Sequence, residues 1–220
     1  MSRPLLQSQL DAATHIYRSW MKAWRATKEA FGLLHDRLPG FSLEVTLLKV
    51  AAINQLYATN VYAVTTMAEH VVDIMKDRPA EPVEVVARLA DLGKGRKHRS
   101  FASKFAHFFI DPQQYHPFDS YTNAMVAYHL EDDAIEDPAN PYAAFADNVE
   151  RLRTRNGLSC EPEEVDRYLW LAGVFRAFRA ARDSGKQPRI NAEALALFES
   201  PCPAAQEALR TLLPADDSGE

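Results

Sequence analysis

The chain has 220 residues, of which 47% are hydrophobic and 25% are charged, and its formal net charge at pH 7 is −5. This length fits one large domain or two small ones, and the apolar fraction supplies enough surface for a real core. The acidic balance excludes the strong positive field of a general nucleic-acid coat protein, so any contact with DNA must be local.

Cysteine usage and the N-terminal segment indicate the compartment. Cys160 and Cys202 are the two cysteines and stand far apart, which argues against a disulfide framework and against a thiolate metal site. Residues 1–7 contain no continuous apolar segment, and no later stretch approaches the roughly 18 apolar residues that a membrane span needs. We therefore expect free thiols, a cytoplasmic location and no membrane partner.

Apolar residues recur at steps of three and four from Pro4 to about Leu34, which predicts one amphipathic helix. Further helices are predicted over residues 43–58, 61–76 and 82–92, with Ser42 as the cap of the first and Thr59 or Asn60 as the cap of the second. A basic loop over residues 93–99 follows, and Ser100 is predicted to cap a helix that runs to about Ile110.

The second half of the chain has the same helical character. Asp119 is the predicted cap of a helix to Leu130, after a loop with two prolines, and an acidic loop over residues 131–137 comes next. The remaining predicted helices cover residues 141–155, 162–182, 191–200 and 203–213. We expect an all-α fold, with one globular multi-helix domain over residues 1–213 and a disordered acidic tail over residues 214–220.

The helix predicted over residues 100–110 has an unusual pattern. Phenylalanine and alanine surround most of its circumference, whereas its polar residues fall in one narrow stripe, made of Ser100, Ser103, Lys104 and His107. A helix that is apolar nearly all round is normally buried. A buried helix with a single polar stripe suggests the wall of a cleft.

Lys104 is the candidate nucleophile on this stripe. It follows a basic loop and lies about one turn inside the helix, between Phe101 and Phe108. Desolvation, the helix dipole and nearby cations all disfavour an ammonium at such a position, and a neutral amine is nucleophilic. The alternative is an ordinary solvated lysine at the end of a basic loop.

Asp119 suits a second role besides capping a helix. A carboxylate fixed by backbone N–H groups stays ionised near neutral pH. Such a group can stabilise a developing positive charge or activate a neighbouring nucleophile.

A short loop separates two segments, Ser100 to Phe109 and His116 to Thr122. Together they resemble the catalytic stretch of the helix-hairpin-helix (HhH-GPD) DNA glycosylases, especially the oxoguanine glycosylases. The resemblance covers about residues 43–130 and implies a degenerate helix-hairpin-helix. It also implies that Lys104 is the Schiff-base nucleophile and that Asp119 is its partner. A longer basic segment separates Gly93 and Gly95 from the lysine than in that family.

Residues 51–70 are similar to the segment with which these enzymes fill the gap left by an extruded base. The resemblance assigns that role to Asn60 and, less directly, to Gln55. The pocket for the extruded base would be lined by aromatic side chains, and the candidates for it are His107, Phe101 and Phe108.

The loop before Lys104 carries a local reversal of charge in an acidic chain. Its cations, which contact phosphate in this interpretation, are Lys94, Arg96, Lys97 and Arg99. A solvated turn is the alternative. His107 and His116 match no standard metal site, so we expect no metal. A lysine nucleophile needs no organic cofactor, so none is expected either.

Three functional hypotheses follow. The preferred one is a DNA glycosylase with AP-lyase activity, an enzyme that excises a damaged or modified base from a duplex with a flipped nucleotide. The second is a DNA-binding protein of the same fold without chemistry. The third is an all-helical protein scaffold that binds another protein through the acidic loop. The excised base, and the choice between repair and defence against foreign DNA, stay open.

Overall fold

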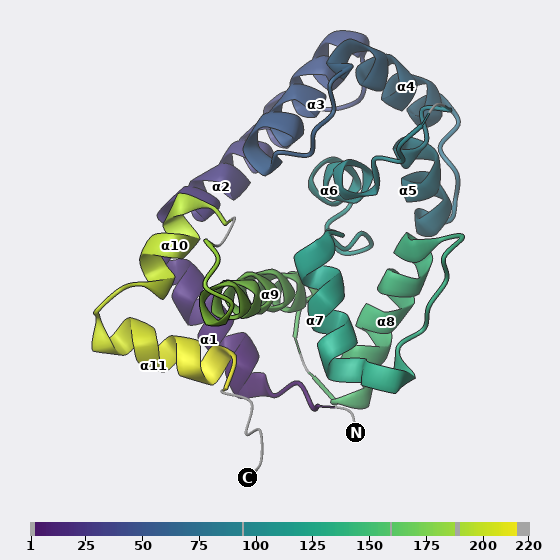
Figure 1. Ribbon diagram of the computed structural model, residues 1–220. Helices are drawn as coiled ribbons and strands as arrows, with labels where there is room; N and C mark the ends of the chain where they lie inside the picture. The colour runs from purple at the N-terminus through teal and green to yellow at the C-terminus, as the bar shows by residue number, and fades with distance from the viewer. Residues whose placement is uncertain (1–2, 94, 159, 188–189, 215–220) are drawn as a thin grey trace. The chain divides into compact units, whose positions relative to one another are not determined.

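The computed structural model describes residues 3–93, 95–158, 160–187 and 190–214, and every regular element there is a helix (Figure 1). This confirms the predicted all-α class. The helices are α1 Gln7–Trp20, α2 Lys22–Arg37, α3 Leu43–Tyr57, α4 Val64–Lys76, α5 Pro82–Ala90, α6 Arg99–Phe109, α7 Ser120–Leu130, the short 3₁₀ helix Glu131–Asp133, α8 Pro141–Arg155, α9 Pro162–Asp183, α10 Ala192–Phe198 and α11 Pro203–Leu212.

Close contacts divide the chain into two compact units. Unit 1 comprises the described parts of Met1–Ala26, Ser120–Ala134 and Val149–Glu220, and unit 2 comprises Thr27–Asp119 and Ile135–Asn148. The single domain predicted over residues 1–213 stays a prediction, because compact units need not fold separately. Of the predicted acidic tail, residues 215–220 lie outside the described residues.

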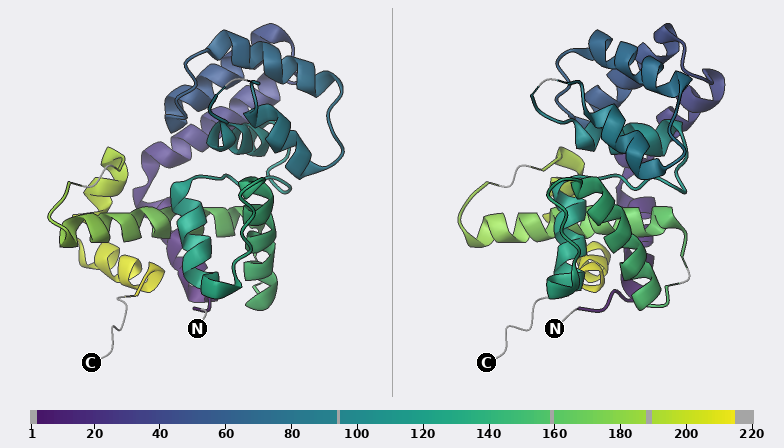
Figure 2. Two further views of the ribbon diagram at one scale, coloured as in Figure 1. Left: turned by 45° about the vertical axis from the view of Figure 1, so that its right-hand side comes forward. Right: turned by 90° about the vertical axis from the view of Figure 1, so that its right-hand side faces the viewer.

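Unit 1 is built around the 22-residue helix α9, which packs against α1, α7 and α10, and α1 packs in turn against α11 (Figure 2). Its core contains a chain of buried polar groups. The Tyr168 hydroxyl lies 2.7 Å from Nε2 of His129, and Nδ1 of His129 donates to the carbonyl of Arg3 at 2.8 Å. Nε2 of Gln9 lies 3.1 Å from the carbonyl of Leu212. These bonds satisfy polar groups that would be costly to bury unpaired.

The first helix was predicted as one element over residues 4–34, and this prediction was wrong. The helix breaks at Met21, whose backbone leaves the helical region (φ −103°, ψ 61°). The Glu193 carboxylate accepts hydrogen bonds from the N–H groups of Ala23 and Trp24, at 2.6 and 3.0 Å. A remote carboxylate thus caps α2 and satisfies its first N–H groups, which stabilises the break.

Unit 2 gathers α3 to α6, with contacts between α3 and α4, α3 and α6, α4 and α5, and α5 and α6 (Figure 2). An aromatic cluster fills its core. The ring of Phe31 lies 4.6 Å from that of Phe108 and 5.7 Å from that of Phe109, and Phe105 lies 5.3 Å from Phe109. Such pairs add specific geometry to the burial of large apolar surfaces.

Two predicted helix starts in unit 2 need correction. Helix α4 begins at Val64, so Thr59 and Asn60 belong to a loop. Helix α6 begins at Arg99, with His98 at the cap position, so Ser100 is not a cap. The hydroxyl of Ser100 is instead an acceptor for a side chain one turn later, described below. The predicted cap of α3 is confirmed, since Ser42 Oγ accepts from the N–H of Val45 at 3.4 Å.

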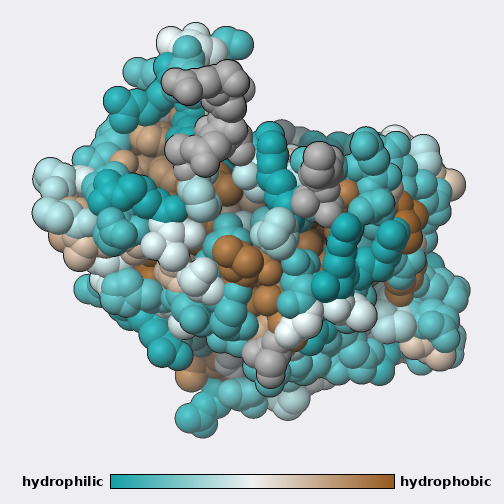
Figure 3. All heavy atoms as spheres, turned by 90° about the horizontal axis from the view of Figure 1, so that it is seen from below, coloured by the Kyte–Doolittle hydropathy of each residue, from teal (hydrophilic) through white to brown (hydrophobic). Residues whose placement is uncertain are grey.

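No helix in the described part of the chain is long and apolar enough to cross a membrane. On the face drawn in Figure 3, hydrophobic residues show as separate groups among hydrophilic ones.

Candidate active site

Helix α6 is the most thoroughly buried helix of unit 2, as its sequence predicted. Its phenylalanines Phe101, Phe105 and Phe109 and its polar residues Ser103 and Lys104 are all buried. A polar group inside a protein needs a partner, because burial without one costs free energy. The polar stripe must therefore find its partners on neighbouring segments.

The Lys104 ammonium has three acceptors within unit 2. Its Nζ lies 2.8 Å from the Ser100 hydroxyl, 3.2 Å from the Asp119 carboxylate and 3.4 Å from the carbonyl of Phe118. The ring of Tyr57 lies to one side, with its centroid 5.7 Å from Nζ. Three acceptors match the three N–H groups of an ammonium, so the geometry accommodates the protonated form. The Lys104 side chain is 4% exposed and that of Asp119 is 17% exposed.

The segment between α6 and α7 is held onto α6 by the other polar residues of the stripe. The N–H of Phe118 donates to Ser103 Oγ at 2.9 Å, and His107 Nδ1 lies 2.8 Å from the carbonyl of Tyr115. Because a carbonyl only accepts, His107 donates this bond and holds the loop onto α6. The bonds fix Phe118, and with it the neighbouring Asp119, beside Lys104.

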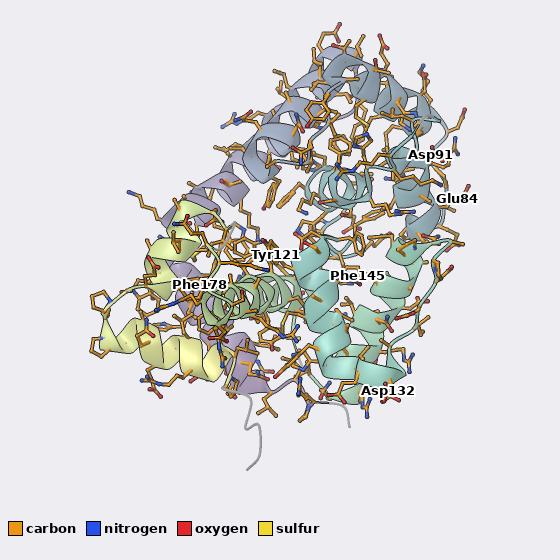
Figure 4. All side chains as sticks on the ribbon, in the orientation of Figure 1. Glu84, Asp91, Tyr121, Asp132, Phe145 and Phe178 are labelled. Atoms are coloured by element: carbon orange, nitrogen blue, oxygen red, sulfur yellow. The ribbon has the colours of Figure 1, made fainter. Side chains whose placement is uncertain are left out.

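The ring of Phe118 anchors the same segment from its apolar side. It lies 5.2 Å from the ring of Phe145 on α8, which is labelled in Figure 4, and 6.3 Å from the ring of Tyr142. Rings at this separation pack edge to face. The backbone that carries Asp119 is thus fixed by hydrogen bonds and by packing, and such fixing is what a catalytic carboxylate requires.

The arrangement of lysine and carboxylate can move one proton. An ammonium that gives its proton to the Asp119 carboxylate becomes an amine with a lone pair, which is a nucleophile toward an electron-poor carbon. The same carboxylate, when ionised, can stabilise a positive charge that develops nearby. Both capacities depend on the 3.2 Å contact between Lys104 Nζ and Asp119 Oδ2.

The basic loop forms a glycine hairpin between α5 and α6. Gly93 and Gly95 have positive φ angles of 74° and 71°, which glycine adopts without strain. The N–H of His98 donates to the carbonyl of Ala90 at 2.8 Å and closes the hairpin. Asp91, labelled in Figure 4, accepts from the N–H of Gly93 at 2.9 Å. These bonds make a turn between α5 and α6.

The predicted phosphate contacts of this hairpin differ in their surroundings. Arg96 and Lys97 are exposed and Arg99 is half-buried, whereas Lys94 lies outside the described residues. Lys97 Nζ lies 3.2 Å from the Asp91 carboxylate, and the pKa of that carboxyl is held below its usual range by the Gly93 N–H and then by Lys97. A phosphate that binds Lys97 would therefore either replace the Asp91 carboxylate as its partner or lie close to that carboxylate.

The loop between α3 and α4 carries the predicted gap-filling residues. The Asn54 side chain accepts from the N–H of Val61 at 2.8 Å and donates to its carbonyl at 3.0 Å. This bridge bends the loop so tightly that Asn60 takes a positive φ of 58°. Asn60 and Gln55 are both exposed, and Tyr62 is 92% exposed. Sequence reasoning missed Tyr62, although an aromatic residue in a polar loop is a signal that could have drawn attention to it.

The predicted base-pocket residues are not equally placed. Phe101 is fully buried and packs against Phe105, with 5.6 Å between the ring centroids. Phe108 is half-buried, and its ring lies 5.6 Å from that of Tyr57. Tyr57, the last residue of α3, is thus an aromatic neighbour of Lys104 that the sequence did not indicate.

Two further findings bear on the other sequence hypotheses. The described residues contain no group of three or more histidine, cysteine or acidic side chains that could hold a metal ion. In the acidic segment after α7, residues 131–137, Oε1 of Glu131 lies 3.7 Å from Nε of Arg3. Oδ2 of Asp133 lies 2.5 Å from Nη1 of Arg155. Part of the charge of that segment is therefore paired within unit 1.

Comparison with known proteins gives matches in sequence to a family model and to an uncharacterized protein. The family model HI_0787_N, described as an N-terminal domain, matches residues 8–114. This match contains Lys104 and ends before Asp119. An uncharacterized protein of Haemophilus influenzae (strain Rd) is 26% identical over 185 residues, covering 76% of this chain and 84% of that protein. No solved structure gives a significant match. Neither description names an activity.

Proposed function

We propose that the chain is a DNA glycosylase with AP-lyase activity, in which Lys104 is the nucleophile and Asp119 its proton acceptor. The observation that carries the proposal is the buried contact of 3.2 Å between the Lys104 amine and the Asp119 carboxylate. A buried titratable pair of this kind is a candidate catalytic group. The resemblance of residues 100–122 to the glycosylase catalytic stretch adds the reaction type.

The reaction would proceed in balanced steps. Lys104 gives a proton to Asp119, and its amine attacks C1′ of the target nucleotide while the bond from C1′ to the base breaks. The base leaves with the bonding electrons and takes the proton held by Asp119. The bond from C1′ to O4′ then breaks, O4′ takes a proton from the Lys104 nitrogen, and the nitrogen forms a protonated imine with C1′. Loss of a proton at C2′ expels the 3′ phosphate and cuts the strand.

The proposal places duplex DNA against unit 2. The exposed hairpin cations Arg96 and Lys97 would contact the backbone phosphates, and Arg99 follows at the start of α6. The exposed Asn60 and Tyr62 would enter the duplex where the nucleotide has left. All of these residues belong to unit 2.

Borohydride trapping tests the proposal. Duplexes that carry oxoguanine, uracil or an abasic site are incubated with the protein, and borohydride reduces any imine to a stable covalent adduct. We expect an adduct with the wild type and none with Lys104→Gln. Lys76→Gln is the matched control, because Lys76 is an exposed lysine of unit 2 paired with Asp73. An adduct that persists in Lys104→Gln would exclude Lys104 as the nucleophile.

One observation favours the non-catalytic alternative. Two of the three acceptors of Lys104, the carbonyl of Phe118 and the carboxylate of Asp119, also tie the segment before α7 to α6, which is what a purely structural lysine would do. In that case the protein binds DNA without forming an adduct on any of the three duplexes. Its affinity for duplex DNA would then survive Lys104→Ala.

A further inference from the structure

Unit 1 contains a hollow of about 500 Å³ that the proposed reaction does not use. It lies between α7, α9 and the residues just after α11, and Tyr121, labelled in Figure 4, and Tyr128 line it from α7. Small-molecule sites in proteins have volumes of roughly 300–1,000 Å³. The hollow is therefore large enough to take part of a ligand.

The close crossing of α7 and α9 shapes this hollow. At Gly173 of α9, an added Cβ would lie 2.5 Å from the carbonyl oxygen of Tyr121, closer than real Cβ atoms approach another atom. Glycine is thus required for the two backbones to come together at this point. The crossing fixes the spacing of the side chains that project around it.

Two arginines of α9 border the hollow with donors to spare. Arg179 uses one nitrogen, Nη1, for long bonds of 3.3 Å to the carbonyls of Leu213 and Pro214. Arg176 is exposed and has no ion pair within the described residues; its guanidinium lies over the ring of Tyr128, 5.0 Å from the centroid. A guanidinium carries five N–H donors in a fixed fork, and stacking on a ring restricts its orientation.

The charge around the hollow favours an anion. Residues 167–182 contain four arginines and no acidic residue, although the whole chain is acidic. Among the described lining residues, Asp183 is the one acidic side chain, against the two guanidiniums of Arg176 and Arg179. Residues three apart on a helix have Cβ atoms about 5–6 Å apart, so both forks can reach one phosphate group or two consecutive ones.

We propose that this hollow binds the phosphate group of a nucleotide, held by Arg176 and Arg179. The phosphate would come either from a free nucleotide or from a DNA strand, and the chemistry of recognition is the same for both. The site lies wholly in unit 1, whereas Lys104 and Asp119 lie in unit 2. The inference therefore does not rest on the proposed glycosylase activity.

Binding measurements on the full chain test this site. The probes are inorganic phosphate and deoxyadenosine monophosphate, followed by calorimetry, and a fluorescent single-stranded thymidine oligomer, followed by anisotropy. We expect Arg176→Ala and Arg179→Ala each to weaken binding roughly tenfold, the loss expected for a charge-assisted hydrogen bond. Arg176→Lys keeps the charge without the fork and is expected to fall between the wild type and Arg176→Ala.

The matched control is Arg182→Ala. Arg182 stands one turn further along α9, lies over the ring of Phe178 and does not border this hollow. We expect it to change affinity less than twofold. Lys76→Gln, at an exposed lysine of unit 2 outside both proposed sites, should also leave binding unchanged. The thermal unfolding of each variant, measured alongside, identifies any variant that fails to fold.

The outcomes distinguish the sources of phosphate. Binding of the mononucleotide that requires both arginines would indicate a free nucleotide, and binding of the oligomer alone would indicate a strand; either supports the site. Equal losses in Arg182→Ala and Arg176→Ala would overturn it, because general electrostatic attraction would then account for the binding. Absence of binding for all three probes at low salt would overturn it as well.

Discussion

Two lysines are buried among the described residues of unit 2, and their surroundings differ. Lys49 of α3 is completely buried; its Nζ donates to the carbonyl of Gly40 at 2.9 Å and lies 4.8 and 5.2 Å from the ring centroids of Phe41 and Phe109. Burial lowers the pKa of Lys49. Lys104 of α6 has a hydroxyl, a carbonyl and a carboxylate as acceptors. Among the described residues, the carboxylate partner is therefore what distinguishes Lys104.

The proposed reaction needs more from a lysine than burial. A nucleophilic amine needs a group that accepts the proton of the ammonium. Lys49 has one carbonyl and two ring faces, none of which can take a proton at neutral pH. Lys104 has Asp119 at 3.2 Å.

The largest expected effect contrasts the chemistry of the two lysines. Lys104→Gln should slow base release in single-turnover assays by roughly 10³-fold or more, as losing a nucleophile usually does. Lys49→Met should change the rate by less than about threefold once both variants are shown to be folded. Equal rates for Lys49→Met and Lys104→Gln would contradict the assignment of the nucleophile to Lys104 rather than to Lys49.

His129 of unit 1 extends the comparison from the buried lysines to a buried histidine, whose pKa is lowered by burial like that of Lys49. Burial lowers the pKa of His129 from 6.5 to about 4. Since the folded value is below the unfolded one, the unfolded chain binds the proton first. The stabilising contribution is complete above pH 6.5 and is lost as the pH falls toward 4, by about 3 kcal/mol. Urea unfolding between pH 7 and 4 measures it, with His129→Gln as the control.

The free energy of unfolding changes between pH 7 and 4 in both the wild type and His129→Gln. The contribution of His129 is the difference between these two changes. Titrating carboxylates contribute equally to the wild type and to His129→Gln. Equal pH slopes in the two proteins would show that burial does not hold His129 neutral.

Asp119→Asn makes the surroundings of Lys104 resemble those of Lys49. The ammonium keeps two of its acceptors but loses its charged partner, so we expect the free energy of unfolding to fall by about 2 kcal/mol at pH 7. Denaturant unfolding measures this change. Lys97 and Asp91 provide the exposed comparison, and Asp91→Asn should change the free energy of unfolding much less than Asp119→Asn. Equal costs for the two substitutions would indicate that the pair of Lys104 and Asp119 is effectively solvated.

The smallest expected effect concerns Lys49 itself. Lys49→Met replaces a buried cation by an apolar chain of similar length, and such replacements are neutral or stabilising. We expect a gain of about 1 kcal/mol in unfolding free energy at pH 7, measured in urea. Lys49→Gln, which keeps a donor for Gly40, should not show this gain. A marked loss of stability in Lys49→Met would mean that the contacts of the ammonium with the carbonyl and rings outweigh its desolvation.

The sequence predicted most of the helices because they follow from local patterns, whereas the pairing of Lys104 with Asp119 was expected from the resemblance to the glycosylases. The polar stripe on an apolar helix and the acidic residue before the next helix lie within 20 residues of each other. The break at Met21 could not be predicted, since the group that caps α2 belongs to Glu193, 170 residues away from Ala23.

The hydrogen-bond partners of polar side chains near the loops were also not predicted. Ser100 has the type and place of a cap, yet its hydroxyl accepts from Lys104, and the helix begins one residue earlier. Asn54 sets the path of the loop after α3 by bonding Val61, and this bond delays α4 to Val64. Patterns of residue type do not reveal which of several possible hydrogen bonds a polar side chain makes.

The bond between Glu193 and the first turn of α2 constrains the order in which the protein can be assembled during synthesis. A ribosome adds Ala23 and Trp24 long before Glu193, so the nascent α2 lacks its cap until nearly the whole chain has been made. All of unit 2, which ends at Asn148, can emerge earlier. Translation is thus expected to leave the apolar face of α1 uncovered until α9 and α11 are available, a period during which a chaperone could bind it.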